Sequence, residues 1–99
     1  MNLNLPLPLS TNDTPWLAAI DQGIARLQAF APGALVVALG LDAHEDDPLK
    51  GFKVTTAGFA HAARHIAKIG LPTVLVQEGG YLSPALGANL TSFLKGYSG

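Results

Sequence analysis

The sequence contains no cysteine and few charged side chains in its 99 residues. The absence of cysteine excludes disulfide frameworks, thiol catalysis and zinc sites built on thiolates. Six Lys and Arg stand against seven Asp and Glu, so the chain has no basic surface of the kind that binds nucleic acid or anionic lipid. Charged residues make up 13% of the chain, against the ~25% usual for soluble domains. This shortage predicts that other protein covers part of the surface.

Long apolar segments are also missing. No window reaches the ~18 apolar residues that a membrane-spanning helix needs, and the first residues have neither the basic start nor the apolar stretch of a secretory signal. We therefore expect a cytoplasmic protein that binds neither membranes nor nucleic acid. The length permits one small domain, and the sequence has no linker or low-complexity tract that would divide it.

Three successive units each pair a short apolar run with an amphipathic stretch. The apolar runs are residues 3–7, 34–41 and 73–77. The second run is continuously apolar, which is typical of a strand covered on both faces of a parallel sheet. Pro6 and Pro8 confine the first run to a sheet edge, or its strand to the first few residues. The sequence therefore predicts an α/β fold of three layers, in which a parallel sheet is built in the order β-α-β-α-β-α.

Each amphipathic stretch has a helix start signal before it. Asp13 or Thr14 is predicted to cap the first helix, and Thr55 the second. Ser83 and Pro84 are predicted to be the N-cap and the first residue of the third helix. In all three helices apolar residues recur at a spacing of three or four, which predicts one buried face on each.

Asp42 directly follows the second apolar run. Because ligands of parallel α/β sheets bind beyond the carboxyl ends of the strands, this carboxylate is expected where a substrate or cation binds. The alternative is a loop carboxylate that accepts hydrogen bonds from nearby backbone N–H groups. An EF-hand is excluded: counted from Asp42, the sixth position is Asp47 where glycine is needed, and the twelfth is Lys53 where glutamate is needed.

A second candidate is the turn Gly79-Gly80-Tyr81 after the third apolar run. Paired glycines let the backbone approach a ligand closely, and a phenol just past them can donate a hydrogen bond to an oxyanion. The alternative is an ordinary strand-to-helix turn with a half-buried tyrosine. No glycine-rich nucleotide-binding pattern is present in the sequence.

The three histidines offer weaker signals. His61 and His65 have the spacing of two metal ligands on one helix, but they lie opposite its apolar face and no glutamate follows His61. Both are therefore predicted to face solvent. His44 stands two residues after Asp42, and we expect it to support the loop rather than to bind a metal.

Two motifs, taken together, resemble the zinc-dependent histone deacetylase family. They are residues 39–49, LGLDAHEDDPL, and residues 76–81, VQEGGY. The likeness is strongest to the bacterial acetylpolyamine amidohydrolases and histone deacetylase-like amidohydrolases, and the opening residues 2–8, NLNLPLP, also fit. The resemblance implies the C-terminal third of the arginase/deacetylase fold. Residues 1–99 are therefore interpreted as a single partial domain, a fragment of an enzyme of about 300 residues.

The resemblance also implies roles for individual residues. Asp42 matches the family's second zinc-binding aspartate, and Tyr81 matches the tyrosine that hydrogen-bonds the substrate carbonyl and the oxyanion formed from it. Leu49 matches an apolar residue of the tunnel for the acyl-lysine or acyl-amine chain, and Gly79 and Gly80 border that tunnel. The implied reaction hydrolyses acetyl-lysine or acetylpolyamine amides: zinc polarises the acetyl carbonyl and activates water, and a histidine base takes the proton.

Two departures from the family pattern bear on this interpretation. Asp46 stands where the family usually has glycine, within a loop in which His44 and Asp47 are expected to support the site without touching substrate. The family's Asp-x-His zinc pair and histidine bases match nothing in the sequence, whereas a catalytic zinc needs about three protein ligands. We therefore expect zinc, and activity, only in the completed enzyme.

The resemblance also predicts association. In the family's sheet topology this chain alone would leave a sheet edge unpaired and apolar helix faces uncovered, which favours self-association or pairing with a complementary N-terminal portion. A different class of function is also consistent with the sequence: a non-catalytic α/β module for binding or oligomerisation, with Asp42 and Tyr81 left from an enzymatic ancestor. A receiver domain is disfavoured because glutamate, Glu78, follows the third apolar run where a lysine is required.

Overall fold

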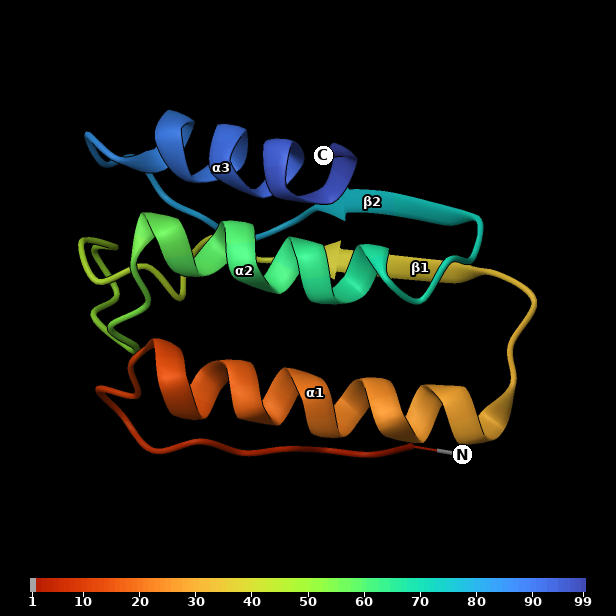
Figure 1. The fold of residues 1–99 in the computed structure, drawn as a ribbon. Coiled ribbons are helices and arrows are strands. Elements are labelled where there is room, and N and C mark those ends of the chain that lie inside the picture. The colour runs from red at the N-terminus through yellow and green to blue at the C-terminus, as the bar shows by residue number, and fades with distance from the viewer. Residues whose placement is uncertain (1) are drawn as a thin grey trace.

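The computed structural model describes residues 2–99, in which three helices pack beside a two-stranded parallel sheet (Figure 1). The elements follow in the order α1 (Asp13–Phe30), β1 (Leu35–Leu39), α2 (Thr56–Ala67), β2 (Thr73–Gln77) and α3 (Leu86–Ser98). The register sets Leu35 opposite Thr73 and Leu39 opposite Gln77. The predicted α/β class, with parallel strands joined through a helix, is confirmed.

The first predicted strand, residues 3–7, is wrong. This segment runs as extended chain beside α1 (Figure 1), and Leu5 packs so closely there that its Cδ1 would lie 3.7 Å from a Cβ at Gly23. Pro6 and Pro8 have no N–H group for a sheet ladder, and Leu5 and Leu7 are partly buried instead. The observed order within residues 2–99 is therefore helix first, with two strands.

The sheet has one covered and one open face. On the covered face Leu39 and Leu75 pack into the core together with α2 and α3. The open face carries Val36 and Val74, which are 74% and 59% exposed. Residues 2–99 thus supply two of the three expected layers. The buried core residues are Leu39, Leu41, Val54, Phe59, Ala63 and Phe93.

Hydrogen bonds join the N-termini of α1 and α2. Thr55 caps α2 as predicted, since its hydroxyl accepts a hydrogen bond from the Gly58 N–H at 3.1 Å. The predicted cap of α1, Asp13 or Thr14, is wrong by one or two residues, because Asn12 is the N-cap and the helix begins at Asp13. The Asp13 carboxylate accepts the Thr55 N–H at 2.7 Å instead, so it links the starts of α1 and α2.

The third helix begins later than predicted. Ser83 and Pro84 lie in a turn that is closed by a hydrogen bond from the Leu86 N–H to the Ser83 carbonyl at 3.2 Å. The N-cap of α3 is therefore Ala85.

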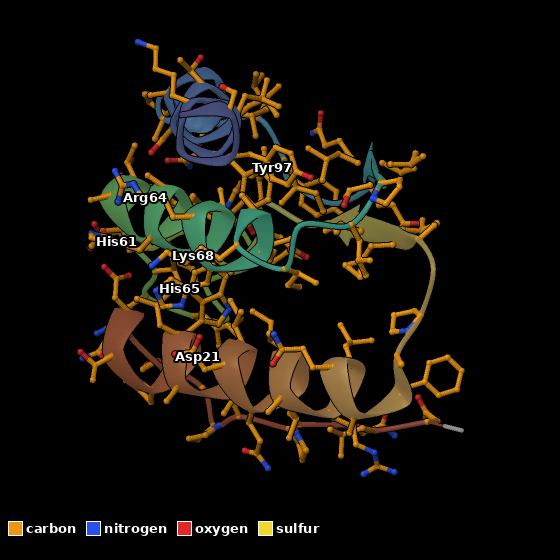
Figure 2. The ribbon with its side chains drawn as sticks, turned by 45° about the vertical axis from the view of Figure 1, so that its right-hand side comes forward. Asp21, His61, Arg64, His65, Lys68 and Tyr97 are labelled. Carbon is orange, nitrogen blue, oxygen red and sulfur yellow. The ribbon has the colours of Figure 1, made fainter. Side chains whose placement is uncertain are left out.

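The second predicted solvent-facing histidine lies between helices. His65 is half-buried, and its Nδ1 is 2.7 Å from Asp21 Oδ1 on α1 (Figure 2). His61 is exposed, and its Nδ1 is 3.4 Å from an Arg64 nitrogen on the same helix. The expectation therefore fits His61, whereas His65 is only partly exposed because Asp21 of α1 lies against it.

Helix α1 leaves part of its apolar face uncovered. None of its residues is fully buried, and Ile20, Ile24 and Leu27 line an open groove toward β1. Neither α1 nor any other helix in residues 2–99 is long and apolar enough to cross a bilayer.

Gly96 allows α3 to approach α2 closely. A Cβ at this position would lie 2.8 Å from the Ala60 Cα and nearer still to the Ala60 carbonyl oxygen, both on the backbone of α2. We expect Gly96→Ala to lower the free energy of unfolding by about 2 to 3 kcal/mol, because a backbone atom cannot move aside as a side chain can. Urea unfolding of the two chains measures this difference. Gly87→Ala is the control, since a Cβ at Gly87 meets no atom within 4 Å; its stability should be unchanged or slightly higher.

Candidate active site

The candidate site lies where the carboxyl ends of β1 and β2 meet at one edge of the sheet. Two loops begin there (Figure 1): the Asp42 loop, residues 40–50, and the Tyr81 loop, residues 78–85. The Leu41 N–H donates to the Gly79 carbonyl at 3.1 Å, so the two loops remain hydrogen-bonded beyond the strands. The prediction from parallel-sheet topology, that both motifs share one edge, agrees with this geometry.

Asp42 lies over two glycines. A Cβ at Gly40 would be 2.8 Å from Asp42 Oδ1, and one at Gly79 would be 3.1 Å from the carboxyl carbon. The absence of side chains at both positions therefore makes room for the carboxylate. Within residues 2–99 the carboxylate accepts no hydrogen bond, so it does not act as the backbone-capping group that was the alternative interpretation. Its oxygens remain available to a ligand.

Gly80 brings the Tyr81 loop against the Asp42 loop. Its φ of 118° lies in a region that residues with a Cβ rarely adopt, and a Cβ there would be 2.9 Å from the Leu41 Cβ. Glycine is therefore required twice, by the backbone conformation and by the contact. Tyr81 follows directly, and its side chain is 54% exposed at the surface of this edge.

A single buried carboxylate contacts both loops. Asp47 is 2% exposed; its Oδ2 accepts the Leu49 N–H at 2.9 Å and its Oδ1 accepts the Tyr81 N–H at 3.3 Å. The structure thus brings the predicted tunnel residue and the predicted oxyanion donor to one anchor. Both side chains point away from the core, since Leu49 is 64% exposed.

His44 is a buried residue of the Asp42 loop. Its Nδ1 accepts the Asp46 N–H at 3.1 Å, so the hydrogen of the neutral ring is on Nε2. Nε2 lies 3.2 Å from the Thr56 hydroxyl, which donates its own hydrogen to Asn89 Oδ1 at 2.6 Å. Because both ring nitrogens are engaged within the chain, neither is free to bind a metal.

Sequence reasoning missed Thr56 and Asn89, which connect the loop to α2 and α3. Asn89 is 1% exposed and lies between Leu86 and Phe93 at helical spacing, on the apolar face of α3. A polar residue on such a face must find a hydrogen-bond partner when it is buried. The place of Asn89 on an apolar helix face could therefore have predicted a buried hydrogen-bond network near the site.

The described residues do not by themselves fit a catalytic zinc ion. No group of three or more His, Cys, Asp or Glu that could hold a metal occurs in residues 2–99. Asp42 can provide one donor, whereas a catalytic zinc site has about three from protein. His61 and His65 are held by other partners on α1 and α2 rather than by each other.

Comparison with known proteins agrees with these features. The family model described as "Histone deacetylase domain" matches residues 1–97. The acetylpolyamine amidohydrolase of Burkholderia pseudomallei is 43% identical over 97% of this chain, and acetylpolyamine amidohydrolase 1 of Pseudomonas aeruginosa is 38% identical over 99%. A crystal structure of the acetylpolyamine aminohydrolase from Burkholderia pseudomallei superposes with a TM-score of 0.93 over 97% of the chain, at 43% identity.

The match covers the chain almost completely and the relatives only in part. The chain spans 28% of the length of both relatives and 28% of the chain in the crystal structure. The fold is that of the corresponding part of the arginase/deacetylase fold, as the two motifs implied. On the family match and these identities, the chain belongs to the histone deacetylase family.

Proposed function

We propose that this chain forms part of a hydrolase that removes acetyl groups from acetyl-lysine or acetylpolyamine amides. The observation that carries the proposal is the pair of interlocked loops at the carboxyl edge of the sheet, with Asp42 over Gly79 and Tyr81 anchored to Asp47. Two relatives that carry the name acetylpolyamine amidohydrolase, at 43% and 38% identity, support the amide class of substrate.

In the proposed reaction Tyr81 stabilises the carbonyl oxygen of the substrate. Its hydroxyl donates a hydrogen bond to the acetyl carbonyl, and this bond strengthens as the carbonyl oxygen gains negative charge in the tetrahedral intermediate. Leu49, Gly79 and Gly80 are proposed to border the channel that holds the acylated chain. Leu49 is exposed at the end of the Asp42 loop, as contact with an apolar chain requires.

Asp42 is proposed to be one zinc donor in the completed enzyme. Its carboxylate accepts no hydrogen bond within residues 2–99, and a hard oxygen donor of this kind suits zinc. The remaining donors and the base that takes a proton from water must come from protein outside this chain. Residues 2–99 alone do not complete the site, and we therefore expect the isolated chain to be inactive.

A complementary portion of a deacetylase domain is the proposed cover for the open surface. β1 has one unpaired edge, and a groove of about 580 Å³ lies between this strand and α1. The groove is open and mostly apolar, and it continues onto the open sheet face with Val36. A parallel strand added to β1 would satisfy its backbone groups and bury these side chains. The relatives, of which this chain spans 28%, are long enough to supply such a strand.

Size-exclusion chromatography tests the proposed cover. We expect the chain to form a one-to-one complex when it is mixed with the remaining part of the Burkholderia pseudomallei amidohydrolase, expressed as a separate polypeptide. A homodimer that persists in the mixture would instead favour self-association, and a monomer that ignores the second polypeptide would contradict the proposal.

A deacetylase fusion tests the reaction. In it this chain replaces the matching segment of the Burkholderia pseudomallei amidohydrolase, so that the missing donors are supplied. We expect the fusion to hydrolyse acetylated polyamine or acetyl-lysine substrates, and the isolated chain to leave both intact. A folded fusion that hydrolyses neither would contradict the proposal and favour a non-catalytic binding module, which the open apolar face would serve.

A further inference from the structure

We infer that the Asp47 carboxylate is a positioning residue, which sets the place of Tyr81 relative to the channel residue Leu49. The inference rests on the proposed function and deepens it, because it assigns a task to a buried charge that the reaction itself does not use. Asp47 touches neither loop's exposed side chains; its two oxygens contact the backbone of both.

Because it is buried, the Asp47 carboxylate requires hydrogen-bond donors from the protein. An ionised group that is 2% exposed is costly unless hydrogen bonds replace its lost hydration. Within residues 2–99 its side chain has two donors, the N–H groups of Leu49 and Tyr81. Because each oxygen serves a different loop, the carboxylate is satisfied only when the two loops lie together. This double requirement couples the position of Tyr81 to that of Leu49.

The surroundings of Asp47 are held in turn from below. The Asp47 N–H donates to the His44 carbonyl at 3.0 Å, and the His44 ring is fixed through Thr56 to Asn89 on α3. The ring of His44 also stacks on Phe59 of the core, with 6.3 Å between ring centroids. Asp47 is therefore seated on the rigid part of the fold, whereas Tyr81 lies in a loop that has no buried side chain of its own before α3. Asp47 thus joins the exposed Tyr81 loop to the buried part of the fold.

Asp47→Asn removes one of the two hydrogen bonds to the loops while the shape of the side chain is nearly unchanged. The asparagine carbonyl can accept one of the two N–H groups, but its NH₂ group faces the other as donor against donor. In the deacetylase fusion we expect kcat to fall by about 10- to 100-fold, since displacement of a reacting group by about 1 Å costs up to ~10²-fold. KM should stay within about threefold if Leu49 keeps its N–H bond. Asp46→Asn is the matched control: the neighbouring side chain is exposed, and kcat should not change.

A double-mutant cycle distinguishes positioning from general destabilisation. If Asp47 acts through the Tyr81 hydroxyl, adding Asp47→Asn to Tyr81→Phe should cost less than about twofold more, because the group it places is already gone. Full additivity of the two losses would overturn the inference. If Tyr81→Phe alone leaves kcat unchanged, the proposed function fails; if Tyr81→Phe lowers kcat but Asp47→Asn does not, only this inference fails.

Hydrogen exchange of the unsubstituted fusion tests the Asp47 contacts even if the Asp47→Asn variant does not fold. In the unsubstituted fusion, NMR should find the Tyr81 and Leu49 amides exchanging more slowly than the amide of Leu82, which has no hydrogen-bond acceptor within residues 2–99. Equal exchange at Tyr81 and Leu82 would show that the Asp47 contact does not form, and would overturn the assignment.

Discussion

Asp42→Asn in the deacetylase fusion is expected to remove bound zinc and to lower hydrolysis by more than about 100-fold. That factor is the upper end of what losing a partner one shell beyond a metal costs, and loss of a direct donor should exceed it. The amide oxygen of asparagine is a neutral and weaker donor than a carboxylate, while the shape of the side chain is kept.

The fold should tolerate Asp42→Asn. The carboxylate accepts no hydrogen bond within residues 2–99, so the change deletes no contact of the folded chain, and the free energy of unfolding should stay within about 0.5 kcal/mol. Zinc content measures the first effect. Urea unfolding of the zinc-free proteins measures the second, because bound zinc would itself stabilise the folded fusion. Glu45→Gln is the control, because this carboxylate lies three positions further along the same loop and is exposed. An Asp42→Asn fusion that keeps both zinc and activity would refute the assigned role.

Tyr81→Phe should have the second largest effect. Loss of one oxyanion donor typically costs about 10²- to 10³-fold in kcat, and the phenylalanine ring keeps the packing of the loop. KM should change little, since the bond strengthens mainly in the transition state.

Steady-state kinetics of the Tyr81→Phe fusion check this expectation, with Tyr97→Phe as the control. Tyr97 (Figure 2) packs beside the core near the C-terminal end of α3, whereas the Tyr81 loop leads into the N-terminal end of this helix. Removal of the Tyr97 hydroxyl should therefore leave kcat within about twofold. Equal kcat values for the Tyr81→Phe and unsubstituted fusions would remove Tyr81 from the reaction.

The elements that the sequence predicted best are those whose signals are local. Thr73–Gln77 is an apolar run between a proline and a glutamate, and it forms a strand with those limits. Thr55 caps α2 through its own hydroxyl, three residues before the amide that it binds. Such contacts depend on near neighbours in the chain, so pattern and structure agree.

The failures concern contacts between distant residues. The alternating leucines of residues 3–7 have the period of a strand, but a strand forms only where a neighbouring strand offers its edge. In residues 2–99 this segment lies beside α1 instead. His65 was assigned to solvent from its own helix, whereas α1 supplies Asp21 from 44 positions away. Neither partner can be read from local spacing.

The candidate site was predicted in its parts and missed in its connections. Asp42 and Tyr81 were singled out from strand ends and the paired glycines, and the structure brings their loops together. The links that join them, Asp47 to the Tyr81 amide and His44 to Thr56, span 34 and 12 positions. Only the fold specifies which buried polar groups meet across such separations.

We propose that this chain carries part of a deacetylase site, which other protein must complete. The zinc content of the isolated chain and of the deacetylase fusion tests this, after both are dialysed against the same trace of zinc. We expect about one tightly bound zinc per fusion molecule and none on the isolated chain, since Asp42 alone provides a single donor. One tightly bound zinc per isolated chain, together with hydrolysis of an acetylated amide, would contradict it.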